Sequence, residues 1–305
     1  MNHHLDVSQL DLIWSLPFLG ILFSIAILPI LAPKLWHHHL GKVALFWVIV
    51  VVAPFINTFG ISVAVKEVAH TMLIEYLPFI ILLLSLYTIT GGIKFRGHFV
   101  GTPGSNIIFL FVGTALASII GTTGAAILLI RPIIEANHWR KNNVHVIVFF
   151  IFLVANIGGS LTPLGDPPLF LGFLQGVDFF WPAKNMILPM LLSCSMLFGI
   201  FYALDNYLFS KEKAPPEHLQ KIEPRSGGEQ FQIIGKGNIL ILLGVVLSVL
   251  MSGIWDSGVS INILGTDLEL QNILRDLSLL ILCVLSIKVT SDAVSYTHLT
   301  LPTKA

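Results

Sequence analysis

The sequence predicts an all-α protein that crosses a membrane several times. Of its 305 residues, 55% are hydrophobic and 11% are charged, against roughly 25% charged residues in soluble domains. Most of its uncharged apolar runs reach the roughly 18 residues that cross a bilayer as a helix, and none alternates like the strands of a membrane barrel. The runs are 12–32, 43–65, 76–93, 105–130, 146–165, 185–204 and 237–255, with a shorter candidate at 277–287.

The first three runs are predicted to be ordinary spans. No Lys or Arg precedes Lys34, so the first run lacks the basic flank of a signal peptide and is expected to remain as a helix. We predict a loop at residues 33–42. Its three adjacent histidines, residues 37–39, are expected to lie at headgroup level, because neighbouring loop residues seldom converge on one metal ion.

Basic residues predict which segments face the cytoplasm. Lys and Arg concentrate in four polar segments, which the positive-inside rule places on the cytoplasmic side: 33–42, 91–105, 136–143 and 209–236. All four can lie inside only if the segment 105–136 enters the membrane and returns as a re-entrant hairpin. This topology puts the N-terminus, Lys66 and Lys184 outside.

The residues in the middle of the proposed hairpin are small, and two of them are polar. Gly121, Thr122, Thr123 and Gly124 divide the run into two arms, each about half a crossing, because roughly 15 helical residues rise about 22 Å. Thr122 and Thr123 would then offer hydroxyls to an ion near the bilayer centre. The alternative is that these small residues only allow two helices to pack closely.

The most informative stretch is NIGGSLTPLGDPPLF, residues 156–170, inside a predicted broken crossing at 144–176. A helix in lipid must satisfy its own backbone, so a break at that depth lines protein or water. Asp166 costs about 2.5–3.5 kcal/mol at a helix centre, which favours an ion or substrate pathway over a packing kink. Freed carbonyls and neutral side-chain oxygens suit sodium. The candidate site residues are Asn156, Gly158, Gly159, Thr162, Pro163, Gly165 and Asp166, with Asp166, Asn156, Thr162 and Thr122 as the predicted sodium ligands.

Three further charged residues are secondary candidates. Arg131 and Glu135 lie four residues apart on the second hairpin arm, where they would form a structural ion pair or take part in gating. Glu75 opens the third span from outside and is either an interfacial acid or an entry point for protons.

A return span is expected at 185–208, which completes a first membrane repeat at 1–209. Prolines, glycines and mixed charges predict a cytoplasmic linker at 210–236. Residues 237–293 then begin a second repeat, because transporters are often built from two inverted repeats.

Two motifs carry a family resemblance: GTTGAAILLIRPII at 121–134 and NIGGSLTPLGDPP at 156–168. They resemble the citrate-transporter-like family of the ion transporter superfamily, and most of all its bacterial NhaD-type sodium/proton antiporters. The resemblance implies an inverted-repeat, elevator-type fold, a homodimer and a location in the bacterial cytoplasmic membrane. The ending SYTHLTLPTKA resembles translated sequencing adapter, so we expect a non-native tail at 294–305, an incomplete second repeat and no transport by residues 1–293 alone.

The leading functional hypothesis is sodium/proton antiport, in which Asp166 binds either ion in turn and no cofactor is needed. The alternative is sodium-coupled transport of citrate, a dicarboxylate or another anion, although Asp166 would repel such a substrate. A remote alternative is an intramembrane aspartyl protease, since LGD at 164–166 is similar to the motif of those enzymes. Its second aspartate would have to be Asp205, at the far cytoplasmic end of its span, so no shared proton and no enzymatic activity are expected.

The expected partners are the lipid bilayer and a small ion or carboxylate. With 17 basic and 17 acidic residues the formal net charge is zero, so no overall field favours nucleic acid.

Overall fold

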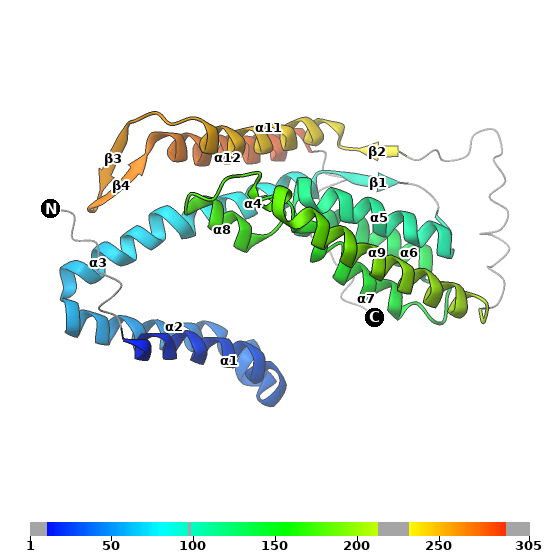
Figure 1. Cartoon of the computed structure of the whole chain (residues 1–305), viewed down its shortest axis with the longest axis horizontal. Helices are drawn as coiled ribbons and strands as arrows, with labels where there is room; N and C mark the ends of the chain where they lie inside the picture. Colours follow the sequence, from blue (N-terminus) through cyan, green and yellow to red (C-terminus); the bar gives the residue numbers. More distant parts are fainter. Residues whose placement is uncertain (1–10, 97–98, 213–231, 291–305) are drawn as a thin grey trace. The chain divides into compact units, whose positions relative to one another are not determined.

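The computed structural model describes residues 11–96, 99–212 and 232–290, and most of them are helical (Figure 1). Within these residues, seven helices are long and apolar enough to cross a membrane. They are Leu12–Leu31, Pro33–Phe59, Ile61–Gly91, Pro103–Ile120, Trp181–Phe209, Lys236–Ile254 and Leu270–Val289. The predicted class, an all-α polytopic membrane protein, is confirmed.

The chain divides into two compact units, of which the first holds residues 1–71 and 264–266. Its helices are α1 (Leu16–Leu31), preceded by the short 3-10 helix η2 (Leu12–Ser15), α2 (Pro33–Phe59) and α3 (Ile61–His70). Helices α1 and α2 contact each other closely, because the Trp47 ring occupies the space that a side chain at Gly20 would need. The indole nitrogen of Trp47 also donates a 3.0 Å hydrogen bond to the Ser24 hydroxyl.

The prediction of a loop at 33–42 is wrong. Pro33 occupies the first turn of α2, where its fixed φ suits a helix start and its missing amide proton is not needed. The helix then continues to Phe59, with a kink at His39, whose φ of −131° and ψ of 21° are not helical. The helical geometry is interrupted at His39 alone, and the residues of this polar segment on both sides of it are helical. Gly60, with a φ of 86°, separates α2 from α3.

The second unit holds residues 72–263 and 267–305. Helix α4 (Leu77–Gly91) follows a π-helical turn, η3 (Thr71–Tyr76), so helix begins well before the predicted start of the third span at residue 76. The following elements are α5 (Pro103–Ile120), α6 (Thr122–Asn137), α7 (Val144–Leu153), η4 (Ile157–Gly159), α8 (Pro167–Leu174) and α9 (Trp181–Phe209). Helix α6 packs on α5 and α4, and α5 also contacts α7 and α9.

Two more long helices complete the second unit, α11 (Lys236–Ile254) and α12 (Leu270–Val289), which pack on each other and on α4. The buried Asn238 joins all three. Its side-chain nitrogen donates to the Gly92 carbonyl at 3.0 Å and to the Thr290 hydroxyl at 2.9 Å, and its oxygen accepts from Ser286 at 2.8 Å. A buried amide that satisfies its donors and acceptor in this way fixes how the helices meet.

Short strands also occur, which the sequence did not predict. Strand β1 (Lys94–Arg96) pairs antiparallel with β2 (Gln232–Ile234), so that Phe95 lies opposite Ile233. Strands β3 (Ser260–Ile263) and β4 (Thr266–Glu269) form a second two-stranded sheet. The end of the predicted linker 210–236 is therefore a strand and the start of α11, whereas its residues 213–231 and the predicted tail 294–305 lie outside the described residues.

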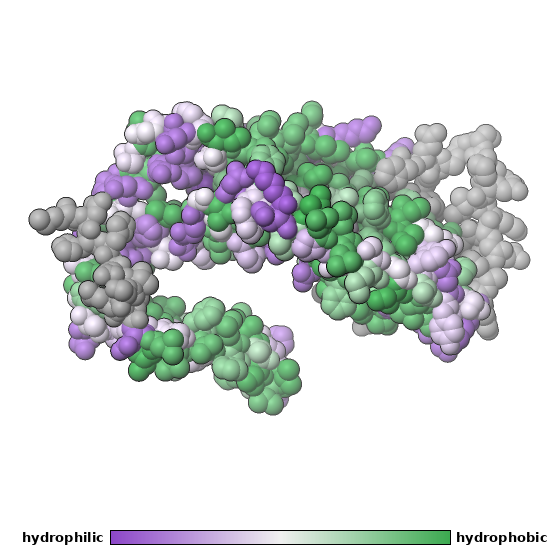
Figure 2. Space-filling view, in the orientation of Figure 1, coloured by the Kyte–Doolittle hydropathy of each residue, from purple (hydrophilic) through white to green (hydrophobic). Residues whose placement is uncertain are grey.

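The exposed surface is largely apolar, as expected for helices that face lipid. Figure 2 shows hydrophobic residues over the visible sides of α1, α2 and α11. Leu19, Leu45 and Leu240 are among the exposed large apolar side chains, while Phe150, Phe170 and Phe201 are fully buried between the helices of the second unit.

Candidate functional site

The tip between α5 and α6 lies against the break between α7 and α8. Gly121 has a φ of 81° and a ψ of 152°, which ends α5 and starts α6. The backbone amide of Thr122 then donates to the Gly165 carbonyl at 3.0 Å. Ser118 on α5 donates to the Gly158 carbonyl at 2.5 Å, and Thr162 donates back to the Ser118 carbonyl. Three hydrogen bonds thus join the two irregular segments directly.

Glycine is required where the broken segment doubles back on itself. A Cβ atom at Gly159 would lie 2.6 Å from the Gly165 carbonyl oxygen, and one at Gly165 would overlap the Gly159 carbonyl. A Cβ at Gly158 would lie 2.8 Å from the Thr114 carbonyl of α5. Such distances leave no room for a side chain, so the three glycines allow backbone to pack on backbone.

Replacing Gly165 by Ala is therefore expected to destabilise the protein by about 1–3 kcal/mol or more, the cost of overpacking a rigid contact. Gly199→Ala on α9 is the matched control, because nothing lies within 4 Å of its Cβ position. In a helix that change is neutral or favourable by up to about 1 kcal/mol. Thermal unfolding in detergent measures the stability of both variants. Equal melting temperatures would show that the contact between Gly159 and Gly165 accommodates a methyl group with no loss of stability.

A pocket lies beside the backbone contact between Gly159 and Gly165. Its polar side chains are Thr122, Thr123 and Asp166, and apolar residues of α4 such as Leu82 and Leu86 form its opposite wall. Asp166 is half-buried at the N-cap of α8, where its side chain makes no capping hydrogen bond. Asp166 is the one charged residue among the described residues that line this pocket.

The predicted site residues do not all reach this pocket. Thr122, Thr123, Pro163, Gly165 and Asp166 line it. Gly158 and Gly159 are not part of its lining and lie in the close backbone contact described above. Asn156 is exposed and does not line it, and the Thr162 hydroxyl is occupied, because it donates to Ser118 and accepts from the Gly165 amide at 3.2 Å.

The secondary candidates lie elsewhere. Arg131 and Glu135 occupy the later turns of α6, away from its Thr122 end, and neither lines the Asp166 pocket. Glu75, in the π-helical turn before α4, accepts a 2.9 Å hydrogen bond from the Gln175 side chain.

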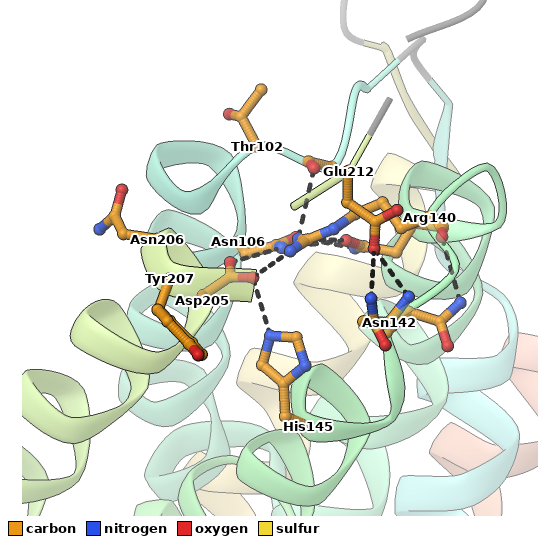
Figure 3. Close-up of polar contacts among 12 residues, drawn as sticks. Thr102, Asn106, Arg140, Asn142, His145, Asp205, Asn206, Tyr207 and Glu212 are labelled. Carbon is orange, nitrogen blue, oxygen red and sulfur yellow. Dashed lines mark hydrogen bonds and ion pairs between the residues drawn. The ribbon is translucent and has the colours of Figure 1, made fainter. Parts of the chain in front are cut away.

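A second polar cluster joins four helix ends and was missed as a unit by sequence reasoning (Figure 3). Asp205 of α9 is fully buried, and its Oδ1 accepts from Arg140 Nη2 at 2.5 Å and lies 2.8 Å from His145 Nε2. Its Oδ2 accepts from Asn106 at 3.0 Å. Asn106 and Asn137 exchange two more hydrogen bonds, of 3.0 and 2.7 Å. The cluster therefore ties α5, α6, α7 and α9 together.

The sequence carried one signal of this cluster, an aspartate within the apolar run of α9. In the sequence, Arg140 is one of the basic residues of segment 136–143 that predict the topology, and Asp205 is a possible second aspartate of a protease. In the structure Asp205 binds Arg140 and does not line the Asp166 pocket.

Glu212 extends the cluster beyond the end of α9. It accepts hydrogen bonds from the backbone amides of Lys141 and Asn142, at 3.1 and 2.8 Å. Partial desolvation opposes ionisation, but these hydrogen bonds outweigh it and lower the pKa of Glu212 below its ordinary value. The charged carboxylate thus holds the 140–143 loop to the end of α9.

Comparison with known proteins identifies the family. A family model described as "Putative citrate transport" matches residues 7–298, which is nearly the whole chain and includes both irregular segments. No curated protein and no solved structure matches the chain. The family supports a secondary transporter in the membrane, in agreement with the seven candidate spans. The chain belongs to the citrate-transporter-like family whose model is described as "Putative citrate transport".

Proposed function

We propose that this transporter exchanges sodium for protons and that Asp166 is the carboxylate for which the two ions compete. The observation that carries the proposal is the composition of the Asp166 pocket, whose lining, within the described part of the chain, has one carboxylate, threonine hydroxyls and no basic residue. A single negative charge in a mostly apolar pocket favours a small cation or a proton over an anion. Loading one ion then expels the other.

The proposed sodium ligands are the Asp166 carboxylate and the Thr122 and Thr123 hydroxyls, with Asn156 and Thr162 reaching the ion only after a rearrangement. Hard cations prefer such oxygen ligands. The hydrogen bonds from Thr122 to Gly165 and between Ser118 and Gly158 support movement of the hairpin and the broken helix as one body. Alternating access then carries the pocket between the two sides of the membrane. We also propose a homodimer in the bacterial cytoplasmic membrane, with the linker 210–236 inside.

The second candidate is sodium-coupled transport of citrate or another carboxylate, which the family description favours. In that case sodium at Asp166 would neutralise the pocket before the anion binds. The N-terminal ends of α6 and α8, at Thr122 and Pro167, belong to the same pocket lining, and helix N-termini favour anions.

A pH gradient in liposomes separates the two candidates. With the full-length protein reconstituted and an acid interior imposed, sodium chloride is expected to dissipate the gradient through exchange. Potassium citrate, the matched control, should leave it unchanged, and sodium citrate should act like sodium chloride at equal sodium concentration. A gradient that responds only when sodium and citrate are present together would contradict antiport and support symport.

A further inference from the structure

A second polar pocket lies between the end of α8, the start of α9, the end of α11 and the start of α12. We call it the Arg275 pocket; residues 173–179, 252–256, 269, 271, 272 and 275 line it. It shares no residue with the Asp166 pocket. The two are nevertheless connected by α8, because Pro167 at its start lines one pocket and Leu174 at its end lines the other.

Arg275 is the unusual residue of this pocket. It is 2% exposed, its Nε donates to Asp276 at 2.7 Å and its Nη1 donates to Asn272 at 3.0 Å. The guanidinium lies over the Phe170 ring at 5.7 Å. Its Nη2 is buried with no hydrogen-bond partner among the described residues. A buried charged donor without an acceptor is costly, so this nitrogen favours an oxygen ligand, and guanidinium groups prefer a carboxylate.

The other charges of the pocket restrict that ligand. Asp178, Asp256 and Glu269 are exposed residues of its lining, so three carboxylates accompany one guanidinium, and Asp178 also lies 3.8 Å from the ammonium group of Lys184 outside the lining. Glu269 already accepts from Gln271 at 2.9 Å and from Asn272 at 3.1 Å, which holds it beside Arg275. A ligand with several carboxylates would be repelled here, whereas an ammonium group would be attracted.

We propose that the Arg275 pocket binds a small zwitterion, with its carboxylate on the Arg275 guanidinium, whose buried Nη2 would turn toward the pocket on binding, and its ammonium group toward the acidic residues. The ligand class is an amino acid or a similar short amino carboxylate. This site is separate from the proposed ion site at Asp166 and does not depend on it.

Isothermal titration of the protein in lipid nanodiscs tests the proposal, with glycine, β-alanine and 4-aminobutyrate as probes. At least one probe is expected to bind saturably and at least about tenfold more tightly than acetate, methylammonium or citrate, a ratio that corresponds to about 1.4 kcal/mol. Arg275→Gln should weaken that binding by about tenfold or more. Lys288→Gln, on the same helix but outside the pocket, should not change it, and neither should Asp166→Asn.

Glu269→Gln tests the proposal independently if Arg275→Gln does not fold. Residue 269 is exposed and the substitution keeps the size of its side chain, so this variant should fold. In this variant the affinity for the zwitterion should exceed the affinity for acetate by a smaller factor than in the parent protein, because one attraction for the ammonium group is lost. The proposal is overturned if no probe binds at concentrations up to about 10 mM, roughly ten times a millimolar dissociation constant. It is also overturned if citrate or acetate binds as tightly as the zwitterions, or if both variants bind like the parent protein.

Discussion

In the full-length protein, Asp166→Asn is expected to abolish sodium-dependent proton flux in liposomes, down to the background of protein-free vesicles. The asparagine keeps the size of the side chain but can neither release a proton nor neutralise a cation. Asp166 is the one charge in the described lining of its pocket, so no neighbouring carboxylate can replace it. The measurement is the rate at which added sodium dissipates an imposed pH gradient.

The same variant should fold normally, which separates loss of function from loss of structure. The Asp166 side chain makes no capping hydrogen bond at the start of α8, and Asn is as good an N-cap residue as Asp. Its melting temperature in detergent should therefore match that of the parent protein. Asp11→Asn, at an exposed position, is the control and should retain full exchange. Undiminished exchange by Asp166→Asn would remove Asp166 from the mechanism.

Asp205→Ala is expected to cost about 3–5 kcal/mol of stability, the usual effect of leaving one partner of a buried ion pair alone. Asp205 and Arg140 both have fully buried side chains, 2.5 Å apart. Removing the carboxylate leaves the guanidinium buried without its counter-charge, and it also removes the Asp205 contact of His145 and one of the two acceptors of the Asn106 side-chain nitrogen. Chemical unfolding of the purified protein in micelles measures the change.

Two controls show that burial causes this effect. Lys184 and Asp178 form an exposed pair at 3.8 Å, with side chains 73% and 61% exposed, so Lys184→Ala should cost less than about 1 kcal/mol. The double substitution Arg140→Met and Asp205→Leu should recover part of the loss, because it removes both charges. A loss below about 1 kcal/mol for Asp205→Ala would show that water reaches the cluster and replaces the carboxylate.

The membrane class of the chain follows from local composition, and so do the two irregular segments. Apolar length defines a span because lipid offers no partner to the backbone. Gly121 lies at the break between α5 and α6, and the three glycines of 156–170 lie where backbone meets backbone. Each of these features depends on chemistry within a few residues, so the sequence shows them directly.

Other parts of the fold were not predicted from the sequence. Residues 33–42 are helical on both sides of a kink at His39, which hydropathy does not reveal. Strand β2 forms because β1 pairs with it across more than a hundred residues of sequence. Neither strand has enough length or alternation to be predicted alone.

The features of the candidate sites also divide into those that the sequence predicts and those that depend on the tertiary structure. By itself the sequence determined that this is a helical membrane protein with a hairpin break at Gly121 and a charged, proline-rich break at Asp166, because backbone geometry and the cost of charge in lipid are local properties. Only the tertiary structure decided that Asp166 shares a pocket with Thr122 and not with Asn156, that Asp205 binds Arg140, and that Arg275 Nη2 has no hydrogen-bond partner within the residues the structure describes. Hydrogen bonds and ion pairs act over about 3 Å, and only folding brings residues from different helices within that distance.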